Sequence, residues 1–189
     1  MKFSISSKIV SLSVLFLLLL SSCSVDNDTQ SFDNSLVSVK LKGTDSQLSK
    51  MNVEILDVQF KVKEDESNPN AWVSLNTINT GIHDLTDLTQ EQELILVDVE
   101  EVTSCFIYNI RVVLGDQNSV IKNGVEYIMD VTPEFQNGSM NIIGKELKAN
   151  TLYEFILEFE IDESVLITSD GFANLNPKMN TVMRQLQLF

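Results

Sequence analysis

The chain has 189 residues, of which 13 are basic and 27 acidic, so its formal net charge is −14 at pH 7. So large an excess of carboxylates repels phosphate backbones and anionic lipid headgroups, and we therefore predict no nucleic-acid partner. The two cysteines are too few for the disulfide framework of a small secreted scaffold.

Residues 1–22 have the pattern of a bacterial lipoprotein signal peptide. Lys2 and Lys8 make the start basic, and an apolar run with two serines follows over residues 9–20. Its length suits a signal-peptide core of roughly 7–15 residues and is short of the ~20 that a membrane-spanning helix needs. The run ends in Leu20-Ser21-Ser22-Cys23, which resembles a lipobox. The small serines admit the peptidase, and the cysteine thiol is nucleophilic enough to take a diacylglycerol.

We therefore predict cleavage between Ser22 and Cys23 and attachment to a membrane through lipid on Cys23. No other cofactor is expected. The predicted location is the cell envelope, as an outer-membrane lipoprotein that faces either the periplasm or the medium. The alternative is an ordinary secretory signal followed by a chance cysteine.

Removal of residues 1–22 leaves 167 residues, which suit one domain. The mature chain keeps all 27 acidic residues and loses two of the 13 basic ones, so its formal charge becomes −16. Residues 23–34 are mostly polar and predict a lipidated flexible tether, followed by a domain over residues 35–189. Cys105 then has no intramolecular partner, and its place at the head of an apolar strand predicts a buried, unreactive thiol.

The dominant hydrophobic period in this domain is two, which is typical of strands with one buried face. The stripe over residues 153–161 is the longest, with Ile156 as its one exception. A change of phase between Ile55 and Leu56 predicts a β-bulge near Ile55. The alternating apolar positions are Val37, Val39 and Leu41; Leu56, Val58, Phe60 and Val62; and Tyr153, Phe155, Leu157, Phe159 and Ile161.

Further strands are expected over residues 92–99, 105–114, 125–131 and 180–188, which are rich in β-branched, leucine and aromatic residues. Asn123-Gly124 and Asn137-Gly138 suit tight hairpin turns. No segment has the caps and 3.6-residue stripe of a helix. These features predict an all-β fold, a single antiparallel β-sandwich of immunoglobulin-like or transthyretin-like type.

The order of these motifs resembles a lipoprotein domain common in Bacteroidota, domain of unknown function number forty-three eighty-two. The resemblance runs from about Leu36 to Leu188 and implies a lipid-anchored, sandwich-like module with no assigned catalytic residues. This chain departs from the family's usual pattern at Gly43-Thr44-Asp45 and at Ser104-Cys105. The segments that carry the resemblance are residues 37–41, 56–62, 72–75, 84–88, 106–114, 159–164 and 174–177.

Two groups of residues could supply metal ligands. His83, Asp84 and Asp87 could bind zinc, but no second histidine or free cysteine is near in sequence, so a solvated loop is the preferred interpretation. The acidic groups Glu64-Asp65-Glu66 and Asp98, Glu100, Glu101 lack the spacing of a calcium loop and are interpreted as surface charge. We therefore predict no metal site.

Trp72, the only tryptophan, could be an exposed stacking platform for a sugar, but its position before Val73 and Leu75 favours the core or its edge. The chain has no nucleophile motif and no phosphate-binding loop. We predict a non-enzymatic binding or structural module of the cell envelope, whose protein or glycan partner the sequence does not identify. The alternative is a hydrolase of envelope glycan that uses a carboxylate pair.

Overall fold

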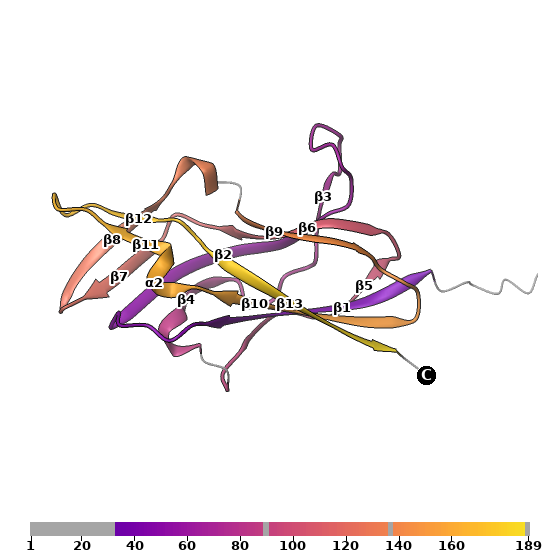
Figure 1. Cartoon of the computed structure of the whole chain (residues 1–189), viewed down its shortest axis with the longest axis horizontal. Coiled ribbons are helices and arrows are strands. Elements are labelled where there is room, and N and C mark those ends of the chain that lie inside the picture. Colours follow the sequence, from indigo (N-terminus) through magenta and orange to yellow (C-terminus); the bar gives the residue numbers. More distant parts are fainter. Residues whose placement is uncertain (1–32, 89–90, 136–137, 188–189) are drawn as a thin grey trace, which may run out of the picture. The chain divides into compact units, whose positions relative to one another are not determined.

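The computed structural model describes residues 33–88, 91–135 and 138–187, and there the chain forms two β-sheets packed together (Figure 1). The predicted signal peptide, its cleavage site and most of the tether lie outside the described residues. Within the described ranges no helix is long and apolar enough to cross a membrane.

The smaller sheet has four strands in the order β13-β10-β1-β5. Their bounds are β1 Asn34–Gly43, β5 Leu94–Thr103, β10 Thr151–Phe159 and β13 Met179–Gln187. β1 lies parallel to β10, whereas β5 and β13 join their neighbours in antiparallel pairs. Strands β5 and β13 are therefore the edges of this sheet.

The larger sheet is built on the long strand β2, Lys50–Lys61, which pairs with β6 and β7 on one side and with the short strands β3 and β4 on the other. Its path runs β11-β12-β8-β7-β2-β6-β9. The bounds are β3 Trp72–Ser74, β4 Gly81–Asp84, β6 Phe106–Leu114, β7 Asn118–Lys122, β8 Val125–Val131, β9 Ser139–Glu146, β11 Val165–Ile167 and β12 Ala173–Leu175.

The predicted all-β sandwich is confirmed, but its sheets are mixed rather than purely antiparallel. β1 pairs with β10, and β8 with β12, in the parallel sense. Period-two alternation specifies which face of a strand is buried and says nothing of the direction of its neighbour, so the sequence could not reveal these pairs.

Between the sheets lies an apolar core to which the predicted stripes contribute. Tyr153, Phe155, Leu157 and Phe159 are all buried on the inner face of β10, as predicted. Phe155 packs edge-on against Phe60 of the opposite sheet, with ring centroids 5.2 Å apart. The stripe's last member, Ile161, is also buried, but it lies in the short helix α2, Ile161–Ser164. The other helical turns described are η1, Leu85–Asp87, and η2, Pro133–Phe135.

The bulge predicted in β2 is confirmed. Its position shows that Leu56, which the sequence placed in the buried stripe, does not face the core. The register with β6 slips between Ile55 and Asp57, so Leu56 is the extra residue. Ile55 and Val58 are buried, whereas Leu56 is 49% exposed rather than facing the core. An unpaired bulge residue can turn outward without disturbing the burial of its neighbours on either side.

The predicted strand bounds are close to those observed, except that β5 extends to Thr103. The hairpin at Asn123-Gly124 is confirmed, because both residues have positive φ angles, 53° and 77°. Asn137 lies outside the described residues.

Candidate functional site

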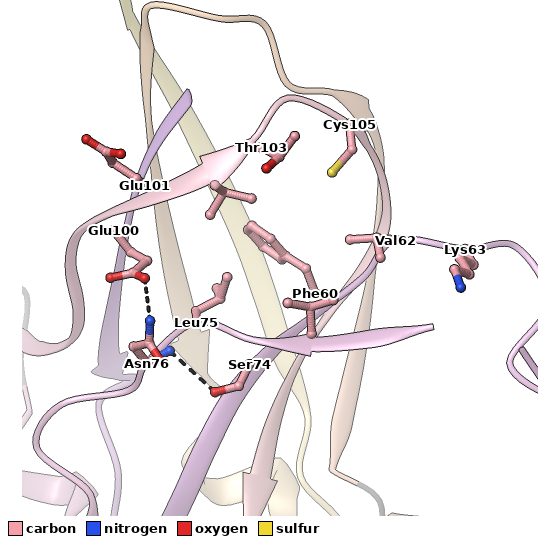
Figure 2. A pocket seen from close by; sticks show the side chains of 12 residues that line it. Phe60, Val62, Lys63, Ser74, Leu75, Asn76, Glu100, Glu101, Thr103 and Cys105 are labelled. Atoms are coloured by element: carbon pink, nitrogen blue, oxygen red, sulfur yellow. Dashed lines mark hydrogen bonds between the residues drawn. The ribbon is translucent and has the colours of Figure 1, made fainter. Parts of the chain in front are cut away.

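A cavity of about 500 Å³ opens between the edge strands β3 and β5 (Figure 2). We call it the β3–β5 cavity. Phe60 and Leu75 form its floor, and both are fully buried members of the core. The lining as a whole is Phe60, Val62, Lys63, Val73, Ser74, Leu75, Asn76, Glu100, Glu101, Val102, Thr103 and Cys105.

Strand β3 is short because its chain is held to β2 at only a few points. The Val62 N–H donates to the Ala71 carbonyl at 2.8 Å, which closes the loop before β3. The Leu75 N–H donates to the Val58 carbonyl at 2.9 Å, and the chain then leaves β2. The following loop crosses to β5, where the Ile78 N–H donates to the Leu96 carbonyl at 2.8 Å. It hydrogen-bonds to the β5 backbone at Ile95 and Leu96, near the start of that strand.

The end of β5 is set off from its start by irregular pairing with β1. The register slips twice, around Leu96 and around Asp98 and Val99. Val99 has a φ of 53°, a costly backbone conformation for a β-branched residue. After this bulge, residues 100–103 pair regularly with β1 and form the other wall of the cavity.

The polar groups at the cavity lie at its rim. Glu100 accepts a hydrogen bond from the Asn76 side-chain amide, and Glu101 is approached by the Asn34 amide at 3.4 Å. Lys63, on the opposite side of the cavity in Figure 2, donates through Nζ to the Pro69 carbonyl at 2.5 Å. Sequence reasoning singled out both glutamates as possible calcium ligands but not as neighbours of a cavity.

Cys105 also lines the cavity, and it is half-buried rather than fully buried as predicted. Burial raises the pKa of the Cys105 thiol, so the thiolate is a minor species at neutral pH. A thiol in this form is a poor nucleophile, and it contributes an apolar surface to the cavity wall.

The residues His83, Asp84 and Asp87 do not converge as a zinc site would require. Asp84 Oδ1 accepts from the Thr86 N–H at 3.1 Å and its hydroxyl at 2.7 Å, so this carboxylate caps η1. It also accepts from the Met51 N–H. His83 Nε2 lies 2.7 Å from the Asn79 carbonyl. In the described ranges, no three His, Cys, Asp or Glu side chains gather where they could hold a metal ion.

Two acidic residues of the loop before β3, Asp65 and Glu66, have local partners. The Ser67 N–H donates to Asp65 Oδ1 at 2.9 Å, and this hydrogen bond lowers the pKa of the Asp65 carboxyl. Glu66 forms an ion pair with Lys61 at 2.9 Å. These contacts describe a charged surface loop.

Trp72, for which the sequence favours the core or its edge, is half-buried on the outer face of the larger sheet and not in the core between the sheets. The Arg111 guanidinium carbon lies 3.8 Å from the centroid of its ring, in a cation–π contact. Arg111 is itself held by Gln59 Oε1, which accepts from Nε at 2.9 Å and from Nη2 at 2.6 Å. Trp72 is paired with Lys61 across the β2–β3 ladder, so its side chain takes the face opposite to that of Phe60.

The predicted surface carboxylates include one that is tightly paired, Glu154. Lys40 Nζ lies 2.7 Å from Glu154 Oε1, and Arg184 lies 3.3 Å from Oε2. The hydrogen bond from Lys40 lowers the pKa of Glu154, and the same contact raises the pKa of Lys40. A general acid needs a carboxyl group whose pKa is raised, so Glu154 is shifted in the wrong direction for that role.

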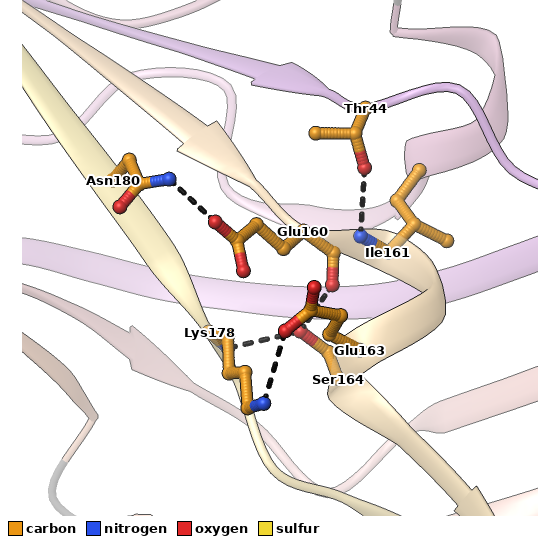
Figure 3. A network of polar contacts seen from close by, with 7 residues as sticks. All are labelled: Thr44, Glu160, Ile161, Glu163, Ser164, Lys178 and Asn180. Carbon is orange, nitrogen blue, oxygen red and sulfur yellow. Dashed lines mark hydrogen bonds and ion pairs between the residues drawn. The ribbon is translucent and has the colours of Figure 1, made fainter.

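The crossover from β10 to β11 is held by a polar network at α2 (Figure 3). The buried Ser164 hydroxyl donates to the Glu160 carbonyl at 2.7 Å and accepts from the Lys178 N–H at 2.9 Å. The Lys178 ammonium forms an ion pair with Glu163 at 3.1 Å, and Thr44 Oγ1 accepts from the Ile161 N–H at 3.1 Å. Residues 159–164, noted in the sequence as a motif, therefore tie the two sheets together.

The fold and the cavity define a two-sheet β-sandwich with an apolar cavity at one pair of strand edges. The chain belongs to the family described as Domain of unknown function (DUF4382), which matches residues 34–177. Comparisons with curated proteins and with solved structures gave no significant match.

Proposed function

We propose that this chain is a lipid-anchored, non-enzymatic binding module of the cell envelope, and that the β3–β5 cavity receives its ligand. The observation that carries the proposal is an apolar cavity of about 500 Å³ that opens at the surface of an acidic protein. Its volume falls within the roughly 300–1,000 Å³ of ligand pockets, and its lining combines apolar side chains such as Phe60 and Leu75 with polar ones, as in such pockets.

The support for the lipid anchor is the signal-peptide pattern that ends at Cys23. Lipid on Cys23 would hold the module at a membrane, because two or more acyl chains give stable attachment whereas a polyanionic surface gives none. The Cys23→Ala variant should appear in the soluble or unprocessed fraction, while the wild type should stay with membranes in high salt. Release of the wild-type protein by salt alone would contradict the anchor.

The cavity is tested with a neutral apolar dye, Nile red, on the chain from residue 23 onward carrying Cys23→Ala. Dye emission should rise on binding. Val73→Asp should abolish the rise, because Val73 lines the cavity and a carboxylate there would have to be desolvated by the dye. Val125→Asp is the matched control, since Val125 is 50% exposed, Val73 is 40% exposed, and Val125 lies away from the cavity on β8.

The non-enzymatic part of the proposal predicts no turnover of glycan, peptide or ester substrates between acid and neutral pH. Glu100 and Glu101, the carboxylates at the cavity, are consecutive strand residues, and their side chains leave the strand on opposite faces. They are therefore poorly disposed to flank one scissile bond. Hydrolysis that disappears in Glu100→Gln or Glu101→Gln would contradict the non-enzymatic binding module and favour the alternative, a hydrolase of envelope glycan.

A further inference from the structure

Among the described residues, each of the two strands that flank the cavity has one backbone edge without a strand partner. In the β2–β3 ladder, Leu75 and Ala71 are joined to β2 by hydrogen bonds. Because hydrogen-bonded and non-bonded positions alternate in an antiparallel ladder, the peptide groups of Trp72 and Ser74 point away from β2.

The same alternation applies to β5. The Ser104 N–H donates to the Asp33 carbonyl at 2.6 Å, which places the hydrogen-bonded pairs with β1 at Val102 and Glu100. The peptide groups of Glu101 and Thr103 therefore point away from β1. The loop before β4 bonds to the β5 backbone at Ile95 and Leu96, and its Asn76 amide reaches the Glu100 side chain, so, of the strands that the structure describes, none pairs with this part of the edge.

An open strand edge beside an apolar cavity is the arrangement that binds extended peptides. Main-chain hydrogen bonds to the edge hold the peptide, and alternate side chains enter pockets. In the β3–β5 cavity, the floor of Phe60 and Leu75 would receive one large apolar side chain.

The charged residues at the rim favour a peptide with a positive charge. Glu101 is exposed, and Glu100 stands beside it. Lys63, the cation among the lining residues, directs its ammonium group to the Pro69 carbonyl. With a net charge of −14 on the whole chain, the surroundings repel anionic segments and attract cationic ones.

We propose that the β3–β5 cavity binds an extended, cationic segment of a partner protein, which pairs with the free edge of β5 at Glu101 and Thr103. One large apolar side chain of the segment enters the cavity, and a neighbouring Lys or Arg faces Glu101. This inference rests on the proposed function, because it names the class of ligand that the same cavity takes.

The first test uses short synthetic peptides and the chain from residue 23 onward carrying Cys23→Ala, which contains every described residue. The probe is the acetylated peptide Thr-Thr-Lys-Leu-Lys-Thr-Thr, in which the Leu and the two flanking Lys leave an extended chain on opposite faces, and binding is followed by titration calorimetry. Replacing the central Leu by Ala, or both Lys by Glu, should each weaken binding at least tenfold. Binding that is indifferent to both changes would overturn the proposal.

The second test concerns the strand pairing itself. Peptides N-methylated at one alternate set of positions should lose binding, while those methylated at the other set should retain it, because only one set faces β5. Thr103→Pro should weaken binding at least tenfold as well, since it removes the free N–H of the edge, where proline is tolerated. If that variant does not fold, the N-methylated peptides on the unaltered chain decide, and insensitivity to both sets refutes the pairing.

The outcomes separate this inference from the proposed function. If Nile red enters the cavity but no peptide of the series binds, the cavity takes a small apolar ligand and the peptide proposal fails alone. If sedimentation shows that the chain pairs with itself through β5, a second copy is the occupant and the proposal also fails. If neither dye nor peptide binds, both proposals fall together.

Discussion

Leu157 offers the sharpest test of the sandwich, because it lies at the centre of the buried stripe of β10. It is fully buried, with Leu41 of β1 and Thr181 of β13 beside it in register. Leu157→Ala removes three buried carbon atoms, which forfeits about 2.4 kcal/mol at ~0.8 kcal/mol per methylene. A remaining cavity would raise the loss in the free energy of unfolding to about 3–5 kcal/mol.

The chain supplies two controls for this substitution. Leu56→Ala makes the same chemical change at a residue that is 49% exposed, so its cost should be about 1 kcal/mol or less. Glu158→Ala changes the next residue along β10, which forms a 3.1 Å ion pair with Lys42 at the surface. Because partly exposed ion pairs contribute only about 0.2–1 kcal/mol, this cost should also stay below about 1 kcal/mol.

Urea denaturation of the Cys23→Ala chain, followed by circular dichroism, measures all three variants. The dependence of stability on urea should be unchanged, so that shifts of the midpoint report stability alone. Equal losses for Leu157→Ala and Leu56→Ala would show that the assigned faces of β2 and β10 are wrong.

Three further outcomes are expected. Gly43→Ala should lower the melting temperature by several degrees or more, because an added Cβ would lie 2.4 Å from the Leu85 carbonyl oxygen; an unchanged melting temperature would show that this approach of β1 to η1 is absent. The free energy of unfolding should be higher for the wild type than for Glu154→Gln at pH values above 4.5, the ordinary pKa of a glutamate, because Lys40 stabilises the ionised Glu154. This difference should be lost as the pH falls through the lowered pKa of Glu154 in the folded protein. A pH-independent difference would contradict this prediction. In the Cys23→Ala chain, Cys105 should react with iodoacetamide more slowly than a free thiol at pH 7.5 and should reach the ordinary rate in urea; equal rates in the two conditions would refute its burial.

The local pattern of the sequence was sufficient for the class of fold and for most strands. Residues 153–159 alternate so regularly that only a strand could bury one side of them, and their burial follows. The bulge in β2 was also visible, because Ile55 and Leu56 change the phase of the stripe. Its exact residue was not, since either Ile55 or Leu56 could have been the extra one until β6 set the register.

The candidate site depends on contacts that local pattern does not encode. Phe60 and Leu75 read as ordinary core residues, and Glu100 and Glu101 as surface charge, because nothing in the sequence brings β3 beside β5. The face that the Trp72 ring takes is not visible in the sequence for a related reason: only the pairing of β3 with β2 decides that face, and only β6 supplies Arg111 to cover it.

The sequence by itself determined the composition of each strand's two faces and the excess of negative charge, and it predicts a lipid anchor at Cys23, outside the described residues. The tertiary structure alone decided that β1 lies parallel to β10, and that in the described part of the chain β5 is an edge strand beside an apolar cavity. The physical reason is the sequence separation of the residues that decide each feature. Alternation arises from the geometry of successive residues, whereas strand partners and edges are selected by packing between residues far apart in the chain.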